Sequence, residues 1–464
     1  MVFSSPVFLA LFLPLLFLFY VFFRYRTFAL LAGSLLFYSW GEPAALAVML
    51  VVIAVNYGLA LLIGGCASGG RKAKFYLTSG IVLDLTILLV FKYLSFAVGN
   101  LNCLFRPLGF SLNDPAIPLP IGISFYIFQA VSYLVDVYRR EVAPQKNLVS
   151  FAFYVSFFPQ LIAGPIVRYK TIESEIPDRA LKPDNISSGL QRFAVGLAKK
   201  VLVADYMGGI ADVVFSAPAE TVPAVYCWIG AAAYMLQIFY DFSGYSDMAI
   251  GLGRMFNFHF LENFDLPYSA RSLSDFWRRW HISLSSWFRD YLYSPLGGNR
   301  RGTARTCLNL MTVFLLCGLW HGAAWNFIVW GIWHGIGLLA ERLGRGRSWS
   351  LPPVCGNLFV LLFVLVGWVI FRAPTLDYAC VFLGNMFTGN GRVSGFAYPD
   401  MLKFFTFGNV VLFVAGWIFA YAPANGYLKS RSYPVKAVGA FLLLAVAFIF
   451  AMTSWFSPFI YFRF

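Results

Sequence analysis

Long runs of apolar residues dominate the chain, and their length is the first guide to its fold. Several of them approach the ~20 residues that an α-helix needs to cross a hydrocarbon core about 30 Å thick. The runs are Ala10–Phe23, Phe28–Trp40, Ala44–Ile63, Phe75–Val98, Ile121–Val137, Val354–Phe371, Phe404–Tyr421 and Ala437–Trp455. They are continuous rather than alternating, which favours helices over strands. Because backbone groups cannot stay unpaired in lipid, the pattern predicts an all-α, polytopic transmembrane protein.

Basic residues gather between these runs and predict which side each connection faces, because cytoplasmic loops carry an excess of Lys and Arg. Met1–Tyr20 has no basic residues ahead of its apolar stretch, so we interpret it as a retained first span rather than a signal peptide. Arg24 and Arg26 follow it, which predicts that the N-terminus lies outside. Further clusters that fit the cytoplasmic side contain Arg71, Lys72 and Lys74; Arg139, Arg140 and Lys146; Arg300, Arg301 and Arg305; Arg342, Arg345 and Arg347; Lys429, Arg431 and Lys436.

The composition agrees with a membrane protein and argues against a soluble domain, a nucleic-acid-binding protein and a cysteine-based framework. Of the 464 residues, 59% are hydrophobic and only 12% are charged, whereas soluble domains carry about 25% charged residues. The formal net charge of +14 follows from the basic connections, and no nucleic-acid-binding module accompanies it. The seven cysteines are dispersed without a C-x-x-C pair, which argues against a disulfide framework and against a Cys-based zinc site.

The middle of the chain differs from its ends, because Gly, Pro and charged residues interrupt its apolar runs. Gly189–Val203 contains Arg192, Lys199 and Lys200, and Tyr240–Gly253 contains two aspartates among apolar residues. Polar sequence at membrane depth survives inside protein or beside water. We therefore expect re-entrant and interfacial helices around an aqueous cavity at 149–341, between N-terminal spans at 1–148 and C-terminal spans at 342–464. All three belong to one embedded domain, 1–464.

Two of the four histidines are candidates for chemistry. His321 lies between Arg305 and Arg342, which are about 35 mostly apolar residues apart, near the minimum for two crossings. His321 is then expected near the deep end of a helical hairpin, where Gly318 and Gly322 allow close approach. Histidine at such depth indicates a functional site, whereas the plainer interpretation is a histidine bonded within the helix packing.

His281 lies in an aromatic and basic stretch, Ser274–Tyr291, which predicts an interfacial helix capped by Ser274. One interpretation is that the helix is anchored by Trp and Arg and His281 is incidental. The other places His281 at a cytoplasmic cavity mouth, where Arg279 and Arg289 could meet an anionic donor. His334 is expected to pack or cap, and His259 to have no chemical role. No H-E-x-x-H, G-x-S-x-G or phosphate-loop pattern occurs.

Several motifs together resemble the membrane-bound O-acyltransferase family, over essentially the whole chain. The residues are Met1–Ser5, Pro120–Tyr126, Leu161–Pro165, Tyr240–Gly251, Phe276–Tyr293, Leu296–Gly302 and Gly318–Gly322. The match is strongest to the bacterial branch concerned with alginate O-acetylation, to which teichoic-acid D-alanyl transfer is related. The resemblance implies a bacterial inner-membrane enzyme that moves an acetyl group from a cytoplasmic thioester to a hydroxyl. It also implies a periplasmic N-terminus.

The resemblance assigns roles to particular residues. It implies that His321 is catalytic and that His281 is the second characteristic histidine. Neutral imidazole suits general-base work near neutral pH. We expect Trp320, Asn326, Arg279, Arg289, Tyr240 and Asp241 to bind the donor or line the cavity; Asp241 either orients a polar group or pairs with an arginine. No metal or bound cofactor is expected.

The resemblance also implies the reaction partners. Acetyl-CoA is the implied donor, with an acyl-carrier thioester as the alternative. Periplasmic acetyltransferase proteins receive the acetyl group, and an exopolysaccharide, alginate or another polymer, is the final acceptor. Two other functions stay open, namely a transporter or flippase for a lipid-linked sugar and a noncatalytic scaffold.

Overall fold

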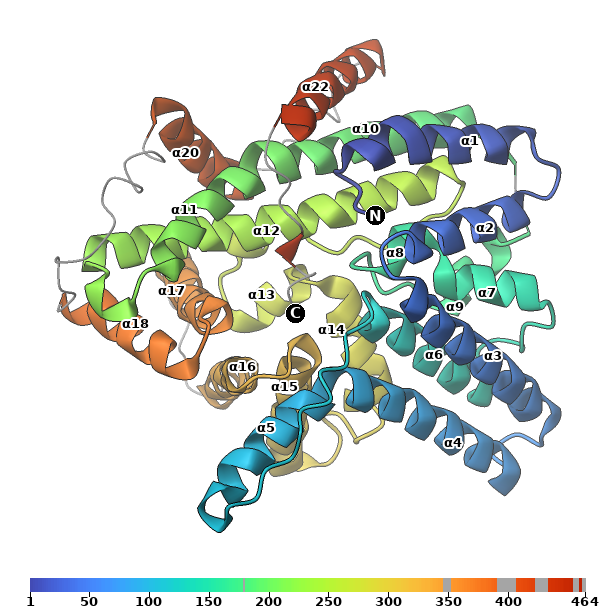
Figure 1. The fold of residues 1–464 in the computed structure, drawn as a ribbon, viewed down its shortest axis with the longest axis horizontal. Coiled ribbons are helices and arrows are strands. Elements are labelled where there is room, and N and C mark those ends of the chain that lie inside the picture. The colour runs from blue at the N-terminus through green and yellow to red at the C-terminus, as the bar shows by residue number, and fades with distance from the viewer. Residues whose placement is uncertain (178–179, 345–351, 390–405, 422–432, 454–458, 461–464) are drawn as a thin grey trace. The chain divides into compact units, whose positions relative to one another are not determined.

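Every regular element in the part of the chain that the structure describes is a helix. The computed structural model describes residues 1–177, 180–344, 352–389, 406–421, 433–453 and 459–460 (Figure 1). All eight apolar runs coincide with helices over their described residues, which confirms the prediction of an all-α protein. Arg345, Arg347, Lys429, Arg431 and the side chain of Lys436, which served in the prediction of sidedness, lie outside the described part.

Four of the described helices are long and apolar enough to cross a membrane. They are Pro43–Gly65, Arg71–Leu108, Gly302–His321 and Pro353–Arg372; shorter apolar helices are Phe8–Phe22, Ile123–Tyr138, Phe407–Tyr421 and Ala437–Thr453. The 38 residues of Arg71–Leu108 are helical throughout but not straight, because a π-helical turn at Leu89–Tyr93 separates two helices that run in different directions (Figure 1). The chain is a polytopic membrane protein.

The described chain forms two compact units, the first comprising Met1–Phe193 and Met248–Leu261. Its elements are η1 (Phe8–Phe12), α1 (Leu13–Phe22), α2 (Arg26–Ser39), α3 (Pro43–Gly65), α4 (Arg71–Leu88), η2 (Leu89–Tyr93), α5 (Leu94–Phe105), η3 (Arg106–Leu108), α6 (Ile123–Tyr138), α7 (Leu148–Ser156), α8 (Phe158–Leu161), α9 (Tyr169–Ile172), η4 (Glu173–Glu175) and most of α10 (Pro183–Ala198). Its core contains a cluster of phenylalanine rings in which Phe3 packs on Phe8, Phe37 and Phe158.

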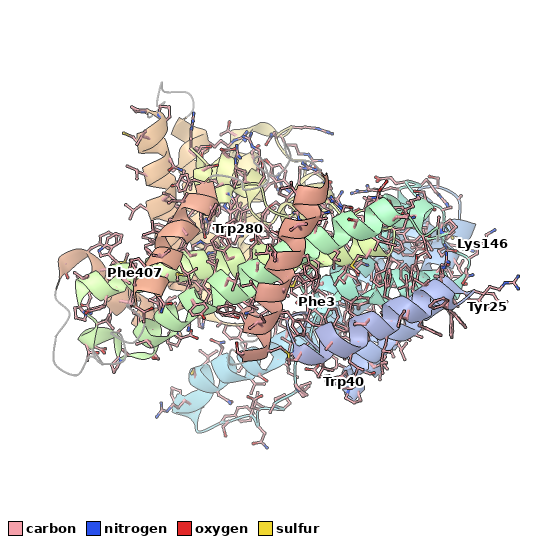
Figure 2. The ribbon with its side chains drawn as sticks, turned by 90° about the horizontal axis from the view of Figure 1, so that it is seen from above. Phe3, Tyr25, Trp40, Lys146, Trp280 and Phe407 are labelled. Carbon is pink, nitrogen blue, oxygen red and sulfur yellow. The ribbon has the colours of Figure 1, made fainter. Side chains whose placement is uncertain are left out.

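Contacts within this unit show whether the basic connections after α3 and α6 lie at the same end of the helices. The Arg140 guanidinium donates to the carbonyl of Gly64 at 3.1 Å, and the Tyr57 hydroxyl donates to the Lys146 carbonyl at 2.7 Å. The connections that follow α3 and α6 therefore meet, as the charge pattern requires. Tyr25 and Lys146 also lie at one end of the unit, away from Trp40 (Figure 2). Which end faces the cytoplasm stays a prediction.

The second unit comprises Ala194–Asp247 and Glu262–Phe464. Its elements are η5 (Lys199–Ala204), α11 (Asp205–Ser216), η6 (Ala219–Thr221), most of α12 (Ala224–Met255), η7 (Pro267–Ser269), α13 (Leu273–Arg279), α14 (Ile282–Phe288), η8 (Arg289–Tyr293), α15 (Gly302–His321), α16 (Trp325–Gly344), α17 (Pro353–Arg372), α18 (Leu376–Thr388), α20 (Phe407–Tyr421) and α22 (Tyr433–Thr453). Trp280, labelled in Figure 2, is 2% exposed and packs on Trp368 with ring centroids 4.9 Å apart. The description of 1–464 as one domain stays a prediction.

Helices α15 and α16 form the predicted hairpin and lie side by side in Figure 1. Their backbones approach closely because glycines face each other. A Cβ atom on Gly318 would clash with the Phe327 carbonyl, and one on Gly331 would clash with the Phe314 carbonyl. Small residues permit such close packing of helices in membranes. The hairpin places His321 at the last position of α15, directly before the turn.

The polar stretch Tyr240–Gly253 is helical throughout, and whether the region 149–341 is re-entrant stays a prediction. The stretch lies inside α12, which runs without interruption from Ala224 to Met255. Its two aspartates are paired, because Asp241 lies 2.7 Å from Lys200 Nζ and Asp247 lies 2.7 Å from Lys199 Nζ. Those lysines occupy η5, a π-helical turn that directly continues α10.

Candidate active site

The His321 ring is enclosed by aromatic side chains in the second unit. His321 is 5% exposed, and its ring centroid lies 5.0 Å from Trp320, 5.0 Å from Trp330 and 5.3 Å from Phe371. All three pairs are close to perpendicular, which is a favourable geometry for aromatic rings. These rings come from α15, α16 and α17, so three helices fix the position of the imidazole.

Asn326 fastens the turn that follows His321. After α15 the chain passes through Gly322 with extended backbone and enters α16 at Trp325. The Asn326 side-chain amide is 5% exposed and donates to the Ala373 carbonyl at 3.0 Å. This bond ties the start of α16 to the end of α17. The contact explains how Asn326 supports the turn, and its role toward a donor stays a prediction.

His281 lies at a sharp break between two short helices rather than inside one. The single interfacial helix expected over Ser274–Tyr291 is wrong, because α13 ends at Arg279 and α14 begins at Ile282. His281 has φ +45°, a left-handed conformation that is uncommon for residues other than glycine. The cap of α13 is also Ser272 rather than Ser274, since the Ser272 hydroxyl accepts from the Asp275 amide at 3.1 Å.

The break buries His281 completely among polar side chains and aromatic rings. Its Nδ1 lies 3.1 Å from Asn263 Oδ1, and its ring is 4.6 Å from Phe242. Burial lowers the pKa of His281 to about 3, because desolvation opposes the charged imidazolium. The imidazole is therefore neutral at any pH near 7.

Trp320 connects the two histidines. Its ring centroid lies 6.1 Å from that of His281 and 5.0 Å from that of His321. The indole comes from α15 and reaches the break between α13 and α14. The structure thus brings together His281, Trp320 and His321, which the sequence placed in two separate motifs.

The two arginines of the candidate site are close to His281 in sequence and differ in their surroundings. Arg279 Nε donates to Asp275 at 3.0 Å, and its Nη1 lies 3.5 Å from Asp265 Oδ2. Arg289 is more exposed, with 65% of its side chain accessible, and pairs with the adjacent Asp290 at 2.8 Å. Both guanidinium groups are accessible enough to meet a soluble anion.

Tyr240 and Asp241 occupy a different part of the second unit. The Tyr240 hydroxyl donates to the Gly416 carbonyl at 2.7 Å. Asp241 is 2% exposed and accepts from Lys200 Nζ through one oxygen and from the Ile460 amide through the other, each at 2.7 Å. The expected arginine partner of Asp241 is wrong, since the cation is a lysine. The hydrogen bonds of these two residues go to Gly416, Lys200 and Ile460 rather than to His281 or His321.

The remaining histidines occupy separate places. His334 is 1% exposed and packs between Trp277 at 5.1 Å and Trp330 at 4.9 Å, as expected for a packing role. His259 belongs to the first unit, where its Nδ1 lies 2.7 Å from Glu175 on an exposed surface. Among the described residues, no group of three His, Cys, Asp or Glu side chains could hold a metal ion.

The sequence did not reveal the contacts of two residues, Asn263 and Lys200. Asn263 lies in an irregular connection, and nothing in its neighbourhood indicates that its side chain reaches a histidine eighteen positions later. Lys200 is 2% exposed and bonds to both Asp205 and Asp241 at 2.7 Å. The pairing of Lys200 could have been expected from the sequence, because a lysine among apolar residues at membrane depth requires an anionic partner.

Known proteins resemble this chain over its full length. The model of the membrane-bound O-acyltransferase family matches residues 137–348, which include His281, Trp320 and His321. The probable alginate O-acetylase AlgI of Azotobacter vinelandii is 46% identical over 393 residues, covering 84% of this chain and 78% of the relative. A peptidoglycan O-acetyltransferase of Helicobacter pylori is 33% identical over 524 residues, covering 100% and 98%.

A more distant relative is the teichoic acid D-alanyltransferase of Streptococcus thermophilus, 30% identical over 236 residues, which covers 47% of this chain and 56% of the relative. The full-length similarities extend well beyond the matched motifs and include the helices around them. The chain belongs to the membrane-bound O-acyltransferase family and is itself a membrane-bound O-acyltransferase.

Proposed function

We propose that the chain transfers an acetyl group from a cytoplasmic thioester across the inner membrane to a hydroxyl, as a step in O-acetylation of an alginate-type exopolysaccharide. The observation that carries this proposal is the pair of buried histidines, His281 and His321, which both pack on Trp320. The alginate and peptidoglycan relatives support acetyl as the transferred group and a polymer as the acceptor.

His321 acts as the general base in the proposed reaction. Its imidazole takes the proton of the acceptor hydroxyl while the oxygen attacks the thioester carbonyl. A C–O bond forms, the C–S bond breaks, and the proton passes from imidazolium to the departing thiolate, so the products are an ester and a free thiol. General-base assistance of this kind contributes about 10²–10⁴-fold to a rate.

The donor is acetyl-CoA or an acetylated carrier protein, which share a phosphate-bearing pantetheine arm. Arg279 and Arg289 are the groups proposed to meet its phosphate, because guanidinium forms strong, paired hydrogen bonds with phosphate oxygens. Arg289 is the better candidate of the two, since its side chain is 65% accessible. His281 lies only two residues from Arg279 and would orient the thioester beyond it.

The orientation of the chain follows from the direction of transfer. We place the basic connections after α3 and α6 in the cytoplasm and the N-terminus in the periplasm. The acetyl group then leaves on the periplasmic side, where partner acetyltransferase proteins receive it and deliver it to the polymer. A shared side for both connections is consistent with the bond from Arg140 to Gly64 at the end of α3 and the bond from Tyr57 in α3 to Lys146.

Transfer of label from acetyl-CoA tests the proposal. Purified wild-type protein with radiolabelled acetyl-CoA and a hydroxyl acceptor should release coenzyme A and label the acceptor. His321→Ala should fold and lose at least about 10²-fold of this activity, because it lacks the base. His259→Ala is the matched control and should retain wild-type activity, since His259 lies on an exposed surface of the first unit beside Glu175.

The same measurement separates the two other functions. A flippase or a scaffold would neither release coenzyme A nor label an acceptor, whatever its histidines. Wild-type rates from folded His321→Ala protein would leave the enzyme in place but remove His321 from its mechanism.

A further inference from the structure

Asn263 binds the Nδ1 edge of the His281 imidazole and belongs to a network of buried hydrogen bonds. Its Oδ1 lies 3.1 Å from His281 Nδ1, and it also accepts from the Ser283 amide at 3.1 Å and the Ser283 hydroxyl at 3.0 Å. Asn263, His281 and Ser283 are each no more than 1% exposed. Water therefore does not compete for these bonds, and each missing partner would be costly.

The backbone N–H of Ser283 shows which way the side-chain amide of Asn263 is oriented. A backbone N–H can only donate, so the atom 3.1 Å from the Ser283 amide is the carbonyl oxygen of Asn263. The other end of the side chain agrees, because Asn263 Nδ2 donates to the Ser246 hydroxyl at 3.1 Å. The oxygen rather than the nitrogen of Asn263 thus faces His281.

This orientation decides which nitrogen of His281 carries the proton. A carbonyl oxygen can only accept, so the Nδ1 atom 3.1 Å away must donate, and neutral His281 has its hydrogen on Nδ1. The Ser283 hydroxyl could instead donate to Nδ1, but that separation is 3.5 Å and its single hydrogen already reaches Asn263 at 3.0 Å. Nε2 is consequently the nitrogen with the lone pair.

We propose that Asn263 is a positioning residue for acetyl transfer, which locks His281 in the Nδ1–H form so that Nε2 accepts a hydrogen bond from the bound substrate. The proposal rests on the proposed function, and it gives His281 a chemical task of its own. The acceptor hydroxyl and the amide N–H groups of the pantetheine arm are the donors that such a nitrogen recognises.

The backbone supports the same arrangement. The Asn263 carbonyl accepts from the Ile282 amide at 3.0 Å, so Asn263 satisfies two amides at the start of α14 through its backbone and side chain. If Asn263 only capped α14, any side chain that accepts a hydrogen bond from the Ser283 amide could replace it. Asn263 would then have no effect on the protonation of a histidine, which provides a way to separate the two roles.

Histidine nitrogen NMR tests the proton position without any need for activity. Labelling with ¹⁵N-histidine gives only four side chains, and the His281 signals are those lost in His281→Gln. The expected result for the wild type is a protonated Nδ1 and an unprotonated Nε2. The same spectrum of Asn263→Leu should show a mixture of both forms. A proton on Nε2 in the wild type would overturn the proposal, even if acetyl transfer were never detected.

Activity measurements test the consequence. Asn263→Leu should lower kcat about 10²-fold, because Nε2 of His281 is then no longer fixed as the unprotonated nitrogen. Asn263→Asp keeps the acceptor and should stay within a few fold of wild type at high pH. Its carboxylate favours imidazolium, so its activity should fall at a higher pH than that of the wild type. Equal kcat and pH profiles for the two variants would contradict a role in positioning.

Controls remove the effects of folding and of other charges. Asn309→Leu removes an equally buried amide, whose Nδ2 donates to the Gly298 carbonyl at 3.2 Å, and it should change neither the His281 spectrum nor the pH profile. If Asn263→Leu does not fold, the wild-type spectrum and the profile of Asn263→Asp decide the question. Ionisable groups on the elements packed against His281 include Asp241, Asp247, Glu262, Asp265, Asp275, Arg278, Arg279, Arg305, Cys317 and His321.

Discussion

At the scale of single residues, the site depends on buried imidazoles held in place by aromatic rings and amides. Trp320 lies against both histidines, while His281 is fixed by Asn263 and His321 by the rings of three helices. A charged imidazolium would be costly in such surroundings, because almost no water reaches it. The arrangement therefore keeps the His281 ring neutral, so that it can accept a hydrogen bond.

The burial of His281 predicts how the stability of the protein depends on pH. Its pKa is lowered to about 3 in the folded protein, compared with about 6.5 when unfolded. Between these values the unfolded chain binds a proton that the folded chain does not. The free energy of unfolding contributed by His281 is therefore constant above about pH 6.5 and falls as the pH drops toward 3.

Thermal melting in detergent measures this dependence. His281→Asn lacks the titrating group and keeps a residue that tolerates φ +45°, so its melting temperature should fall less steeply below pH 6.5. The difference in melting temperature between the wild type and His281→Asn should become smaller as the pH falls. His259→Asn, on an exposed surface, should follow the wild type. Parallel curves for His281→Asn and the wild type would show that His281 is not buried as described.

Sequence reasoning found the histidines but not their partners. Histidine in a deep hairpin and in an aromatic, basic stretch is unusual enough to be noticed from the sequence alone. Asn263 could not be found in this way, because its bond to His281 depends on a sharp turn at residue 281. Lys200 was visible as a charged residue, but its pairing with Asp205 and Asp241 depends on the π-helical turn of η5.

At the scale of elements, close contact between α15 and α16 positions His321. The spacing of basic residues leaves room for two crossings only, which is why the hairpin could be predicted. The short helices α13 and α14 were predicted as one, because helical periodicity continues through Trp280 and His281. The chain breaks there since Asn263 supplies the hydrogen bonds that the start of α14 would otherwise lack.

The hairpin predicts a strong effect of a single methyl group. Gly318→Ala would place its Cβ against the Phe327 carbonyl, so the helices must separate, at a cost of about 1–3 kcal/mol. The variant should melt at a lower temperature and lose activity as His321 shifts. Gly58→Ala in α3 is the control, because a Cβ there meets nothing within 4 Å. An unchanged melting temperature for Gly318→Ala would mean that the hairpin is looser than described.

At the scale of the whole molecule, the apolar runs and basic connections were enough to predict an all-α membrane protein. The helices confirm the runs, and hydrogen bonds confirm that the connections after α3 and α6 share one end. The pairing of α12 with the lysines of η5 was not predictable, since polar residues in an apolar sequence indicate a break as readily as a buried ion pair.

The orientation in the membrane can be tested with the natural cysteines. Cys66 directly follows α3 and should face the cytoplasm, whereas Cys103 is exposed in α5 and should face the periplasm. In spheroplasts, a membrane-impermeant maleimide should label a variant that keeps only Cys103. It should label a variant that keeps only Cys66 after the membrane is opened. Labelling in the reverse order would invert the proposed topology.

Transfer across a sealed membrane is the most direct test of the central claim, that His321 serves a donor and an acceptor from opposite sides. Vesicles containing the protein would carry a hydroxyl acceptor inside and labelled acetyl-CoA outside. We expect wild-type vesicles to accumulate acetylated acceptor in their lumen, and His321→Ala vesicles to accumulate at least about 10²-fold less. Luminal acetylation at the wild-type rate by His321→Ala, or none by the wild type, would contradict the account.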